Sequence, residues 1–273
     1  MKVWINGRSP GRIDWRDRGL QYGDGLFETM RVHEGAVRLL DWHLERLYAS
    51  CIRLTLTPPD EVRLRGEIRR AARRRKDAVL KLVLTRGVGE RGYRPTGRER
   101  TTRIVSLWPA PARAPGEPAA PIRVRICRTR LGRNEALAGM KTLNRLESVL
   151  ARAEWSDPRI AEGLMLDHDG HLVCGTMSNL FLRRGKTLST PLLDHCGIAG
   201  VMRRFVFAQA DSLGLRTVER RVRLEDLRVA EEVFMSNAVA GLMTVGLIID
   251  GRTRIRPPEC DAARRLRGLL ESQ

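Results

Sequence analysis

Long hydrophobic runs are missing from this sequence of 273 residues. Its longest apolar stretches, such as residues 78–84, have the length of a strand, whereas a transmembrane helix needs about 18 or more consecutive apolar residues. The first residues, MKVWINGRSPGRIDW, contain neither the apolar core nor the small-residue cleavage site of an export signal. We therefore expect a cytoplasmic protein that has no membrane span.

Cysteine and histidine are scarce as well, with five residues of each. The cysteines lie far apart and form no CxxC pair, at Cys51, Cys127, Cys174, Cys196 and Cys260. This spacing is typical neither of a disulfide framework nor of a zinc site. His168 and His171 belong to the sequence DHDGH, which is typical of a polar hairpin turn. We expect no bound metal.

Aromatic residues make up only 5% of the chain, and this weakens the nucleic-acid interpretation that a net charge of +18 invites. Five of the 50 basic residues are lysines, which leaves 45 arginines spread along the whole sequence. The densest basic run, residues 69–76, falls on a predicted helix, where it would form a solvated face. RNA-binding surfaces usually combine basic with aromatic residues. Nucleic-acid binding therefore stays a remote alternative.

The N-terminal half contains short apolar segments separated by turn residues. Strands are predicted at residues 3–6, 26–32, 79–85 and 103–108. An amphipathic helix is predicted over residues 39–54, because its apolar side chains recur at spacings of three and four. A second helix should follow the turn at Pro58-Pro59, with Val62 and Ile68 among its apolar positions.

A proline-rich segment separates the two halves of the chain. The stretch PAPARAPGEPAAP contains five of the 13 prolines, and proline at this density disfavours both helix and sheet. We therefore predict an N-terminal domain over residues 1–110, a linker over 111–121 and a C-terminal domain over 122–273. The second half mixes strands and helices without a regular βαβ alternation, which favours an α+β fold over a doubly wound sheet.

Lys141 is a candidate for covalent chemistry because lysine is so rare in this chain. It stands between Gly139-Met140 and a predicted amphipathic helix whose apolar positions include Leu146 and Val149. An arginine cannot replace an amine that must form a Schiff base, since a guanidinium does not deprotonate. An ordinary surface lysine is the alternative interpretation.

Two loops have the composition of anion-binding sites. In CGIAGVMRRF, a glycine turn leads into a predicted helix, whose free N–H groups and dipole would favour a phosphate. The second loop, Ser236-Asn237-Ala238, offers further backbone amides and an amide side chain. Glycine turns of this kind occur in every globular protein. Together with the rare lysine, however, the loops suggest a cofactor that carries an aldehyde and a phosphate.

The chain resembles the fold-type IV enzymes that use pyridoxal 5′-phosphate, which form the aminotransferase class IV family. Within this family it is most similar to the branch of 4-amino-4-deoxychorismate lyases. The resemblance rests on segments that follow the family's order along nearly the whole chain. These segments are DRGLQYGDGLFETMRV, HLERL, LTRGVGERGY, LAGMKTLNRLESVL, SNLF, GIAGVMR and SNAVAG.

The resemblance implies a homodimer of two-domain subunits, like the D-amino-acid aminotransferases, with the cofactor in the cleft between the domains. The lysine that carries the cofactor corresponds to Lys141. The ligands of the cofactor phosphate correspond to the side chain of Arg46, the backbone N–H groups of Val201 and Met202, and residues Asn237 and Ala238.

Two further residues take on roles through the same resemblance. Thr29 in FETMRV corresponds to a threonine that lyases of this type place near the reacting centre, where related aminotransferases usually differ. Arg91 in GERGY corresponds to a loop position that often binds substrate carboxylates. A loop arginine without a role is the alternative for Arg91.

Cys174 departs from the family pattern. The family usually has a glutamate there, five residues before the asparagine of SNLF, that faces the pyridine nitrogen of the cofactor. A carboxylate keeps the ring protonated and a strong electron sink, whereas a neutral thiol would not. The alternative is that Cys174 only packs.

The activity that the resemblance implies is the conversion of 4-amino-4-deoxychorismate to 4-aminobenzoate and pyruvate, a step that supplies folate synthesis. Its partners would be this small substrate and a second copy of the chain, with neither a nucleic acid nor a membrane. A D-amino-acid or branched-chain aminotransferase of the same fold is the alternative, against which Thr29 and Cys174 count.

Overall fold

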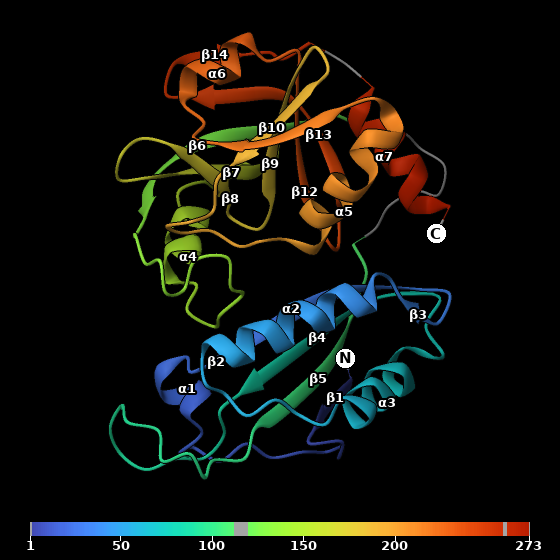
Figure 1. The fold of residues 1–273 in the computed structure, drawn as a ribbon, viewed down its shortest axis with the longest axis vertical. Coiled ribbons are helices and arrows are strands. Elements are labelled where there is room, and N and C mark those ends of the chain that lie inside the picture. The colour runs from blue at the N-terminus through green and yellow to red at the C-terminus, as the bar shows by residue number, and fades with distance from the viewer. Residues whose placement is uncertain (1, 112–119, 259–260, 273) are drawn as a thin grey trace. The chain divides into compact units, whose positions relative to one another are not determined.

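The computed structural model describes residues 2–111, 120–258 and 261–272, which form two compact units (Figure 1). Unit 1 comprises Met1–Ala112 and Met140–Asn144, and unit 2 comprises Arg113–Gly139 and Arg145–Gln273. Most of the predicted linker, residues 112–119, lies outside the described residues. The short segment with Lys141 belongs with the N-terminal residues in this division.

Unit 1 is built on a five-stranded antiparallel sheet with the order β1-β5-β4-β2-β3. The strands are β1 (Lys2–Ile5), β2 (Gly25–His33), β3 (Ala36–Val37), β4 (Asp77–Thr85) and β5 (Thr102–Pro109). Its helices are α1 (Arg18–Tyr22), α2 (Leu40–Arg53) and α3 (Glu61–Ala72). The predicted strands and both long helices of this half are confirmed.

The strand β2 carries different chemistry on its two faces. Leu26, Met30 and Val32 are buried with Leu44 and Leu47 of α2, so this face looks onto the helix. Successive side chains of a strand point to opposite faces. Phe27 and Thr29 therefore lie on the other face, and both are only partly buried.

Unit 2 contains a nine-stranded mixed sheet with the order β11-β10-β9-β12-β13-β6-β7-β8, and β14 pairs with β13. The strands are β6 (Ile122–Leu131), β7 (Ile160–Asp167), β8 (Leu172–Gly175), β9 (Asn179–Arg184), β10 (Thr187–Pro191), β11 (Arg216–Arg220), β12 (Glu232–Asn237), β13 (Gly241–Asp250) and β14 (Thr253–Ile255). Parallel and antiparallel pairs occur side by side, for example β6 with β7 and β12 with β13. The predicted α+β class is confirmed.

The helices of unit 2 are α4 (Leu146–Arg152), α5 (Val201–Ala210), a 3-10 turn η1 (Asp211–Leu213), α6 (Leu224–Val229) and α7 (Ala262–Glu271). The helix α5 packs on the face of the sheet that carries Phe181 and Phe234, and its Phe207 meets the ring of Phe181 edge-on. The N-cap residue Gly200 lies close to Asn179, the first residue of β9, which pairs with Ser236 of β12.

One predicted apolar helix face, that of α4, and one predicted apolar residue of α3 point to solvent instead of the core. In α4, the side chains of Leu146, Val149 and Leu150 are 77%, 59% and 61% exposed, and Ala151 is the one buried residue of this helix. In α3, Val62 is 81% exposed, because Leu64, Ile68 and Ala72 form the stripe that meets the sheet. The periodicity of α4 correctly predicted a helix but not what covers its apolar side.

The segment Met140–Asn144 extends the edge of β2 in unit 1. The backbone N–H of Phe27 donates to the carbonyl of Lys141 at 3.0 Å, and the N–H of Leu143 donates to the carbonyl of Gly25 at 3.0 Å. Thr142 forms an antiparallel bridge with Leu26. These bonds explain why a residue of the C-terminal half belongs to the N-terminal unit.

Candidate active site

Lys141 lies on the face of β2 that the helices do not cover. Because Thr142 is paired with Leu26, its neighbour Lys141 projects to the opposite side, together with Phe27. Its Nζ atom is 4.0 Å from the centre of the Phe27 ring. A second lysine, Lys81 of β4, has its Nζ 5.2 Å from the same ring. Two of the five lysines in the chain therefore meet over one aromatic ring.

Thr29 shares this face of β2 with Phe27. The two residues are separated by one position, which corresponds to about 7 Å along a strand. Lys81 is the residue opposite Thr29 in the β2–β4 pairing. The structure thus brings together the amine of Lys141, the amine of Lys81 and the hydroxyl of Thr29 on one sheet surface, where a proton can be exchanged with a small bound molecule.

On the other face of β2, a buried carboxylate holds two basic side chains. Glu28 is 1% exposed and accepts hydrogen bonds from Arg46 Nε at 2.9 Å and Arg46 Nη2 at 2.5 Å. His43 Nδ1 lies 2.6 Å from the same carboxylate. Arg46, for which the family resemblance predicts a phosphate-binding role, is thus already held by an ion pair that the sequence analysis missed.

Arg91 is exposed in the loop that follows β4. Its neighbours in the loop are anchored by Arg18, a buried residue of α1, which donates to the carbonyls of Gly92 at 2.8 Å and Tyr93 at 2.7 Å. Arg18 Nε also donates to Asp24 at 2.9 Å. The anchored backbone fixes the base of the Arg91 side chain and leaves its charged end to solvent.

In unit 2, the start of α5 offers free backbone N–H groups. Gly200 is the N-cap residue and no side chain caps this end, so the first N–H groups of the helix, which include Val201 and Met202, have no partner within it. Asn179 Nδ2 donates to the carbonyl of Ile198 at 2.8 Å. A side chain at position 200 would lie 2.1 Å from Asn179 Oδ1, which explains the glycine.

Ser236 of β12 is an unexplained polar residue below this helix start. It pairs directly with Asn179 across the sheet, so the two side chains project from the same face. Ser236 is 1% exposed, and among the residues that the structure describes its Oγ has no hydrogen-bond partner. A buried hydroxyl without a partner is costly unless a bound group satisfies it.

Asn237 and Ala238 continue from Ser236 into the turn between β12 and β13. Asn237 Oδ1 accepts hydrogen bonds from the N–H groups of Val239 at 3.0 Å and Ala240 at 2.7 Å. The side-chain oxygen of Asn237 therefore shapes its own turn. This orders the backbone beside Ser236, while the predicted role of Asn237 and Ala238 toward a phosphate remains a prediction.

Cys174 lies in β8, opposite Met165 of β7, and packs on a cluster that contains Cys127, Val173 and Leu193. Burial raises the pKa of the Cys174 thiol, so the group is uncharged near neutral pH. The turn that follows is held by buried Glu162, which accepts hydrogen bonds from the N–H of Thr176 at 3.0 Å and Ser178 Oγ at 2.8 Å. Cys174 therefore offers a neutral, ordered side chain.

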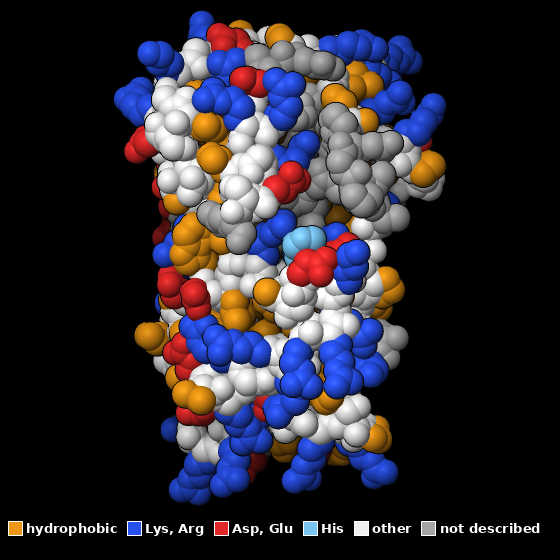
Figure 2. Space-filling view, turned by 90° about the vertical axis from the view of Figure 1, so that its right-hand side faces the viewer, with side chains coloured by type: hydrophobic (Ala, Val, Ile, Leu, Met, Phe, Trp, Pro, Cys, Tyr) orange, Lys and Arg blue, Asp and Glu red, His pale blue; other side chains and the backbone are white. Residues whose placement is uncertain are grey.

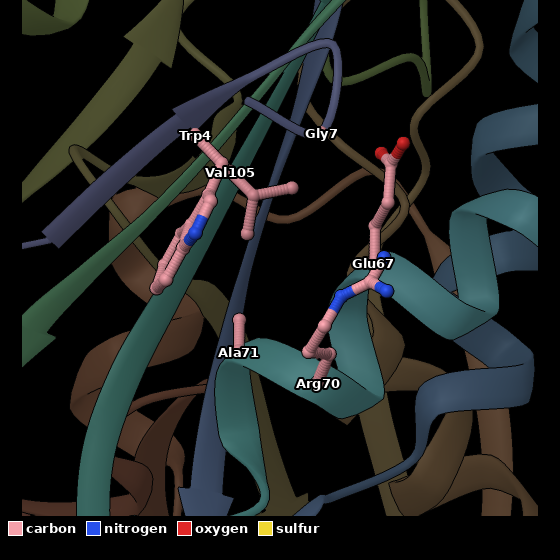
Figure 3. A pocket seen from close by; sticks show the side chains of 6 residues that line it. All are labelled: Trp4, Gly7, Glu67, Arg70, Ala71 and Val105. Atoms are coloured by element: carbon pink, nitrogen blue, oxygen red, sulfur yellow. The ribbon is translucent and has the colours of Figure 1, made fainter. Parts of the chain in front are cut away.

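The described residues contain further polar features. Figure 3 shows a hollow between α3 and the strands β1 and β5, with room for about one water molecule. It is lined by Trp4, Gly7, Glu67, Arg70, Ala71 and Val105. A group of possible metal ligands lies at the end of β7 and consists of Asp167, Asp169 and His171. Asp167 Oδ1, however, already accepts hydrogen bonds from two backbone N–H groups of its own turn. On the face seen in Figure 2, basic side chains are interrupted by neutral, apolar and acidic ones.

Among the described residues, no helix is both long and apolar enough to cross a membrane. This agrees with the lack of long apolar runs in the sequence.

Comparison with known proteins identifies relatives along almost the whole chain. The family described as amino-transferase class IV matches residues 25–248. An aminodeoxychorismate lyase of Vibrio harveyi is 34% identical over 269 residues, which cover 98% of this chain and 99% of the relative. A putative branched-chain-amino-acid aminotransferase of Methanocaldococcus jannaschii is 33% identical and covers 92% of this chain and 89% of its own length.

The fold matches the crystal structure of 4-amino-4-deoxychorismate lyase from Pseudomonas aeruginosa with a TM-score of 0.91. The two sequences are 42% identical, and the match covers 99% of this chain and 98% of the other.

Proposed function

The chain belongs to the class IV aminotransferase family, and we propose that it is a pyridoxal 5′-phosphate enzyme that converts 4-amino-4-deoxychorismate to 4-aminobenzoate and pyruvate. The observation that carries the proposal is the placement of Lys141 Nζ on the same face of β2 as Thr29, in a chain that is 42% and 34% identical to two lyases over nearly full length. An amine and a hydroxyl on one surface suit proton transfer.

The residues present fit this cofactor. Lys141 supplies the amine for its aldehyde, and the uncapped start of α5 supplies N–H groups for its phosphate. The buried Ser236 hydroxyl, which has no partner among the described residues, adds a hydrogen-bond donor below the same helix start. We assign Arg46, Asn237 and Ala238 to the cofactor phosphate through the family pattern.

When bound, pyridoxal phosphate supplies an electron sink for the pair of electrons that a removed proton leaves behind. We assign this proton transfer to the amine of Lys141, which takes the proton from the ring carbon that bears the substrate amine. Thr29 assists by holding a proton on its hydroxyl next to the amine. Arg91 binds a substrate carboxylate from the loop that Arg18 anchors.

The neutral thiol of Cys174 favours the lyase over the aminotransferase. A thiol whose pKa is raised by burial does not keep a ring nitrogen protonated in the way a carboxylate does. The lyase product gains an aromatic ring as the enolpyruvyl group leaves, so its reaction depends less on a strong electron sink. In an aminotransferase reaction no leaving group takes up these electrons.

The direct test is to measure pyruvate released from 4-amino-4-deoxychorismate by the purified, cofactor-loaded protein. The lyase proposal predicts continuous release of equimolar pyruvate and 4-aminobenzoate. In parallel, the enzyme is mixed with D-alanine, L-alanine or leucine, and the cofactor absorbance is followed. Rapid loss of that absorbance with one of these amino acids, and no pyruvate from 4-amino-4-deoxychorismate, would assign the aminotransferase function instead.

We also propose that the enzyme is a homodimer and that α4 forms part of the contact between its subunits. The helix exposes three apolar side chains at positions i, i+3 and i+4, namely Leu146, Val149 and Leu150. Exposed apolar surface of this kind often marks a protein–protein interface. The family pattern supplies the expected partner, a second copy of the chain.

Replacing Leu146 with glutamate would place a charge in this contact. We expect Leu146→Glu to shift the molar mass measured by light scattering from the dimer toward the monomer. Val62→Glu is the matched control, because Val62 is similarly exposed but stands alone on α3. A wild-type protein that is monomeric at micromolar concentration would refute the dimer, and an unshifted Leu146→Glu dimer would exclude α4 from the contact.

A further inference from the structure

The carboxylate of Glu28 is paired with Arg46, the side chain that is expected to bind the cofactor phosphate. Arg46 directs Nε and Nη2 at the two oxygens of Glu28, at 2.9 Å and 2.5 Å. The Arg46 side chain is 14% exposed, whereas that of Glu28 is 1% exposed. Glu28 is thus the buried end of this ion pair, and the Arg46 side chain is the end with some exposure to solvent.

His43 completes this buried group from one turn earlier in α2. Burial lowers the pKa of His43, although its bond to Glu28 opposes the shift, so the imidazole is neutral near neutral pH. For Glu28, burial alone would raise the pKa, but the charge of Arg46 and the hydrogen bond from His43 lower it to about 2. An ionised carboxylate can only accept, so His43 Nδ1 carries the proton and donates at 2.6 Å.

The group has no net charge in this state. Glu28 contributes one negative charge, Arg46 one positive charge and His43 none. The negative charge of Glu28 therefore reduces the attraction of Arg46 for a phosphate, so increasing that attraction is not the role of Glu28. What the carboxylate does supply is a fixed position, because two parallel hydrogen bonds hold the planar guanidinium in one orientation.

The buried group and the lysine are linked through one strand. Glu28 stands between Phe27 and Thr29, so the carboxylate projects to one face of β2 while the Lys141 amine lies over Phe27 on the other. The charge of Lys141 also contributes to the lowered pKa of His43, after burial and the charge of Arg46. A shift of Arg46 would thus move the cofactor phosphate relative to Lys141, the residue proposed to hold the aldehyde end of the cofactor.

We propose that Glu28 is a positioning residue, which holds the Arg46 guanidinium ready for the cofactor phosphate, and that His43 in turn orients Glu28. The inference rests on the proposed function, because it takes Arg46 as a phosphate ligand. It adds two residues, on β2 and α2, that act through Arg46 and do not touch the phosphate themselves.

Unit 1 contains a matched pair for comparison. Glu67 of α3 accepts from Arg103 Nε at 3.0 Å and from Nη2 at 2.9 Å, and both residues are buried to a similar degree as the first pair. Glu67 lines the small hollow of Figure 3, away from Lys141 on the helix-covered side of the sheet. Removing the Glu67 charge therefore reproduces the loss of a buried ion pair without affecting the cofactor.

The test compares Glu28→Gln with Glu67→Gln. Apoenzyme is titrated with pyridoxal phosphate, and the 31P resonance of the bound phosphate is recorded. We expect Glu28→Gln to weaken cofactor affinity by about 10- to 100-fold, by analogy with the loss of residues that orient metal ligands. The variant should also shift the 31P resonance and reduce cofactor-saturated turnover less than affinity. Glu67→Gln should lower the melting temperature but keep the wild-type affinity and 31P shift.

Two further variants keep the test decisive if Glu28→Gln does not fold. His43→Asn preserves a donor at the position of Nδ1 and should bind the cofactor almost as the wild type does, whereas His43→Leu should weaken binding. The double variant Glu28→Gln/Arg46→Met removes both charges. If Glu28 acts through Arg46, its cofactor affinity equals that of Arg46→Met alone.

The outcomes separate this inference from the proposed function. A wild-type protein that binds no pyridoxal phosphate would overturn the function. A wild-type protein that binds it, together with a Glu28→Gln variant of unchanged affinity and 31P shift, would overturn only the positioning role. Equal losses of affinity in Glu28→Gln and Glu67→Gln would reduce the role of Glu28 to general stability.

Discussion

The two units of the chain present their polar groups in different forms. In unit 1 they are charged, as in the ion pairs of Glu28 with Arg46 and of Arg18 with Asp24, and in the amines of Lys141 and Lys81 over Phe27. In unit 2 the groups at the start of α5 are neutral: backbone N–H groups, the amide of Asn179 and the hydroxyl of Ser236. Only groups that gain or lose a proton can move one, so we expect the proton transfer to depend on unit 1 and the neutral groups of unit 2 to act on cofactor affinity alone.

The largest effect expected from this contrast is the loss of Lys141. Lys141→Ala should abolish turnover and the near-visible absorbance of the bound cofactor, because no other amine is placed on the open edge of β2 in the described structure. Lys81→Ala is the matched control, since Lys81 faces the same aromatic ring. Retained absorbance in Lys141→Ala, or its loss in Lys81→Ala alone, would transfer the role to Lys81.

Thr29 tests whether the same face of β2 also assists the proton transfer. Thr29→Val keeps the shape of the side chain and removes its hydroxyl, so turnover should fall by roughly 100- to 10,000-fold, the usual contribution of acid–base assistance. Cofactor affinity should change little, and Thr29→Ser should restore most of the rate. Steady-state pyruvate release provides the measurement. If the Thr29→Val enzyme had wild-type turnover, Thr29 would have no part in the proton transfer, which would be left to Lys141.

Ser236 gives the corresponding test in unit 2. Ser236→Ala should weaken cofactor binding by about 1.5 kcal/mol, or about tenfold, because a hydrogen bond to a charged phosphate is lost. Saturated turnover should stay near the wild-type value. Ser189→Ala is the control, since Ser189 is buried in β10 and its Oγ already accepts from Arg220 at 3.2 Å. If Ser236→Ala binds the cofactor normally, its hydroxyl does not contact the phosphate.

Cys174 should produce the smallest change in the lyase rate itself. Cys174→Glu would place a carboxylate where the family usually has one, which should strengthen the electron sink and raise side transamination of alanine relative to lyase activity. The lyase rate should move less, because aromatisation of the product already favours the reaction. Half-reactions with D- and L-alanine measure the change, and Cys174→Ser serves as a neutral control. Equal gains in the serine variant would contradict an electrostatic cause.

Local sequence patterns predicted most elements of the fold because buried apolar residues recur at regular spacings within each element. The apolar spacing of α2 corresponds to Leu44, Leu47 and Cys51, which are buried in the structure. The strands β10 and β11 were not predicted, since TLSTP and RTVER lack an apolar alternation. Backbone hydrogen bonds stabilise them instead, because β10 pairs with β9 on one side and with β11 on the other.

The candidate site could be predicted where one residue type was chemically unusual, as with Lys141 among so many arginines. Glu28, His43 and Ser236 could not be found in this way. Their importance comes from contacts between residues distant in the chain, and a glutamate in a strand looks the same in the sequence whether it faces water or Arg46. The apolar face of α4 escaped prediction for the same reason, because periodicity does not say what covers a helix.

The most direct test of this account is to locate the cofactor on the chain. Borohydride reduction of the loaded enzyme fixes pyridoxal phosphate to the amine that holds it, and peptide mapping then identifies the residue. The account predicts a single pyridoxyl group on Lys141, on the edge of β2. A pyridoxyl group on Lys81, Lys2, Lys76 or Lys186, or no adduct at all, would contradict it.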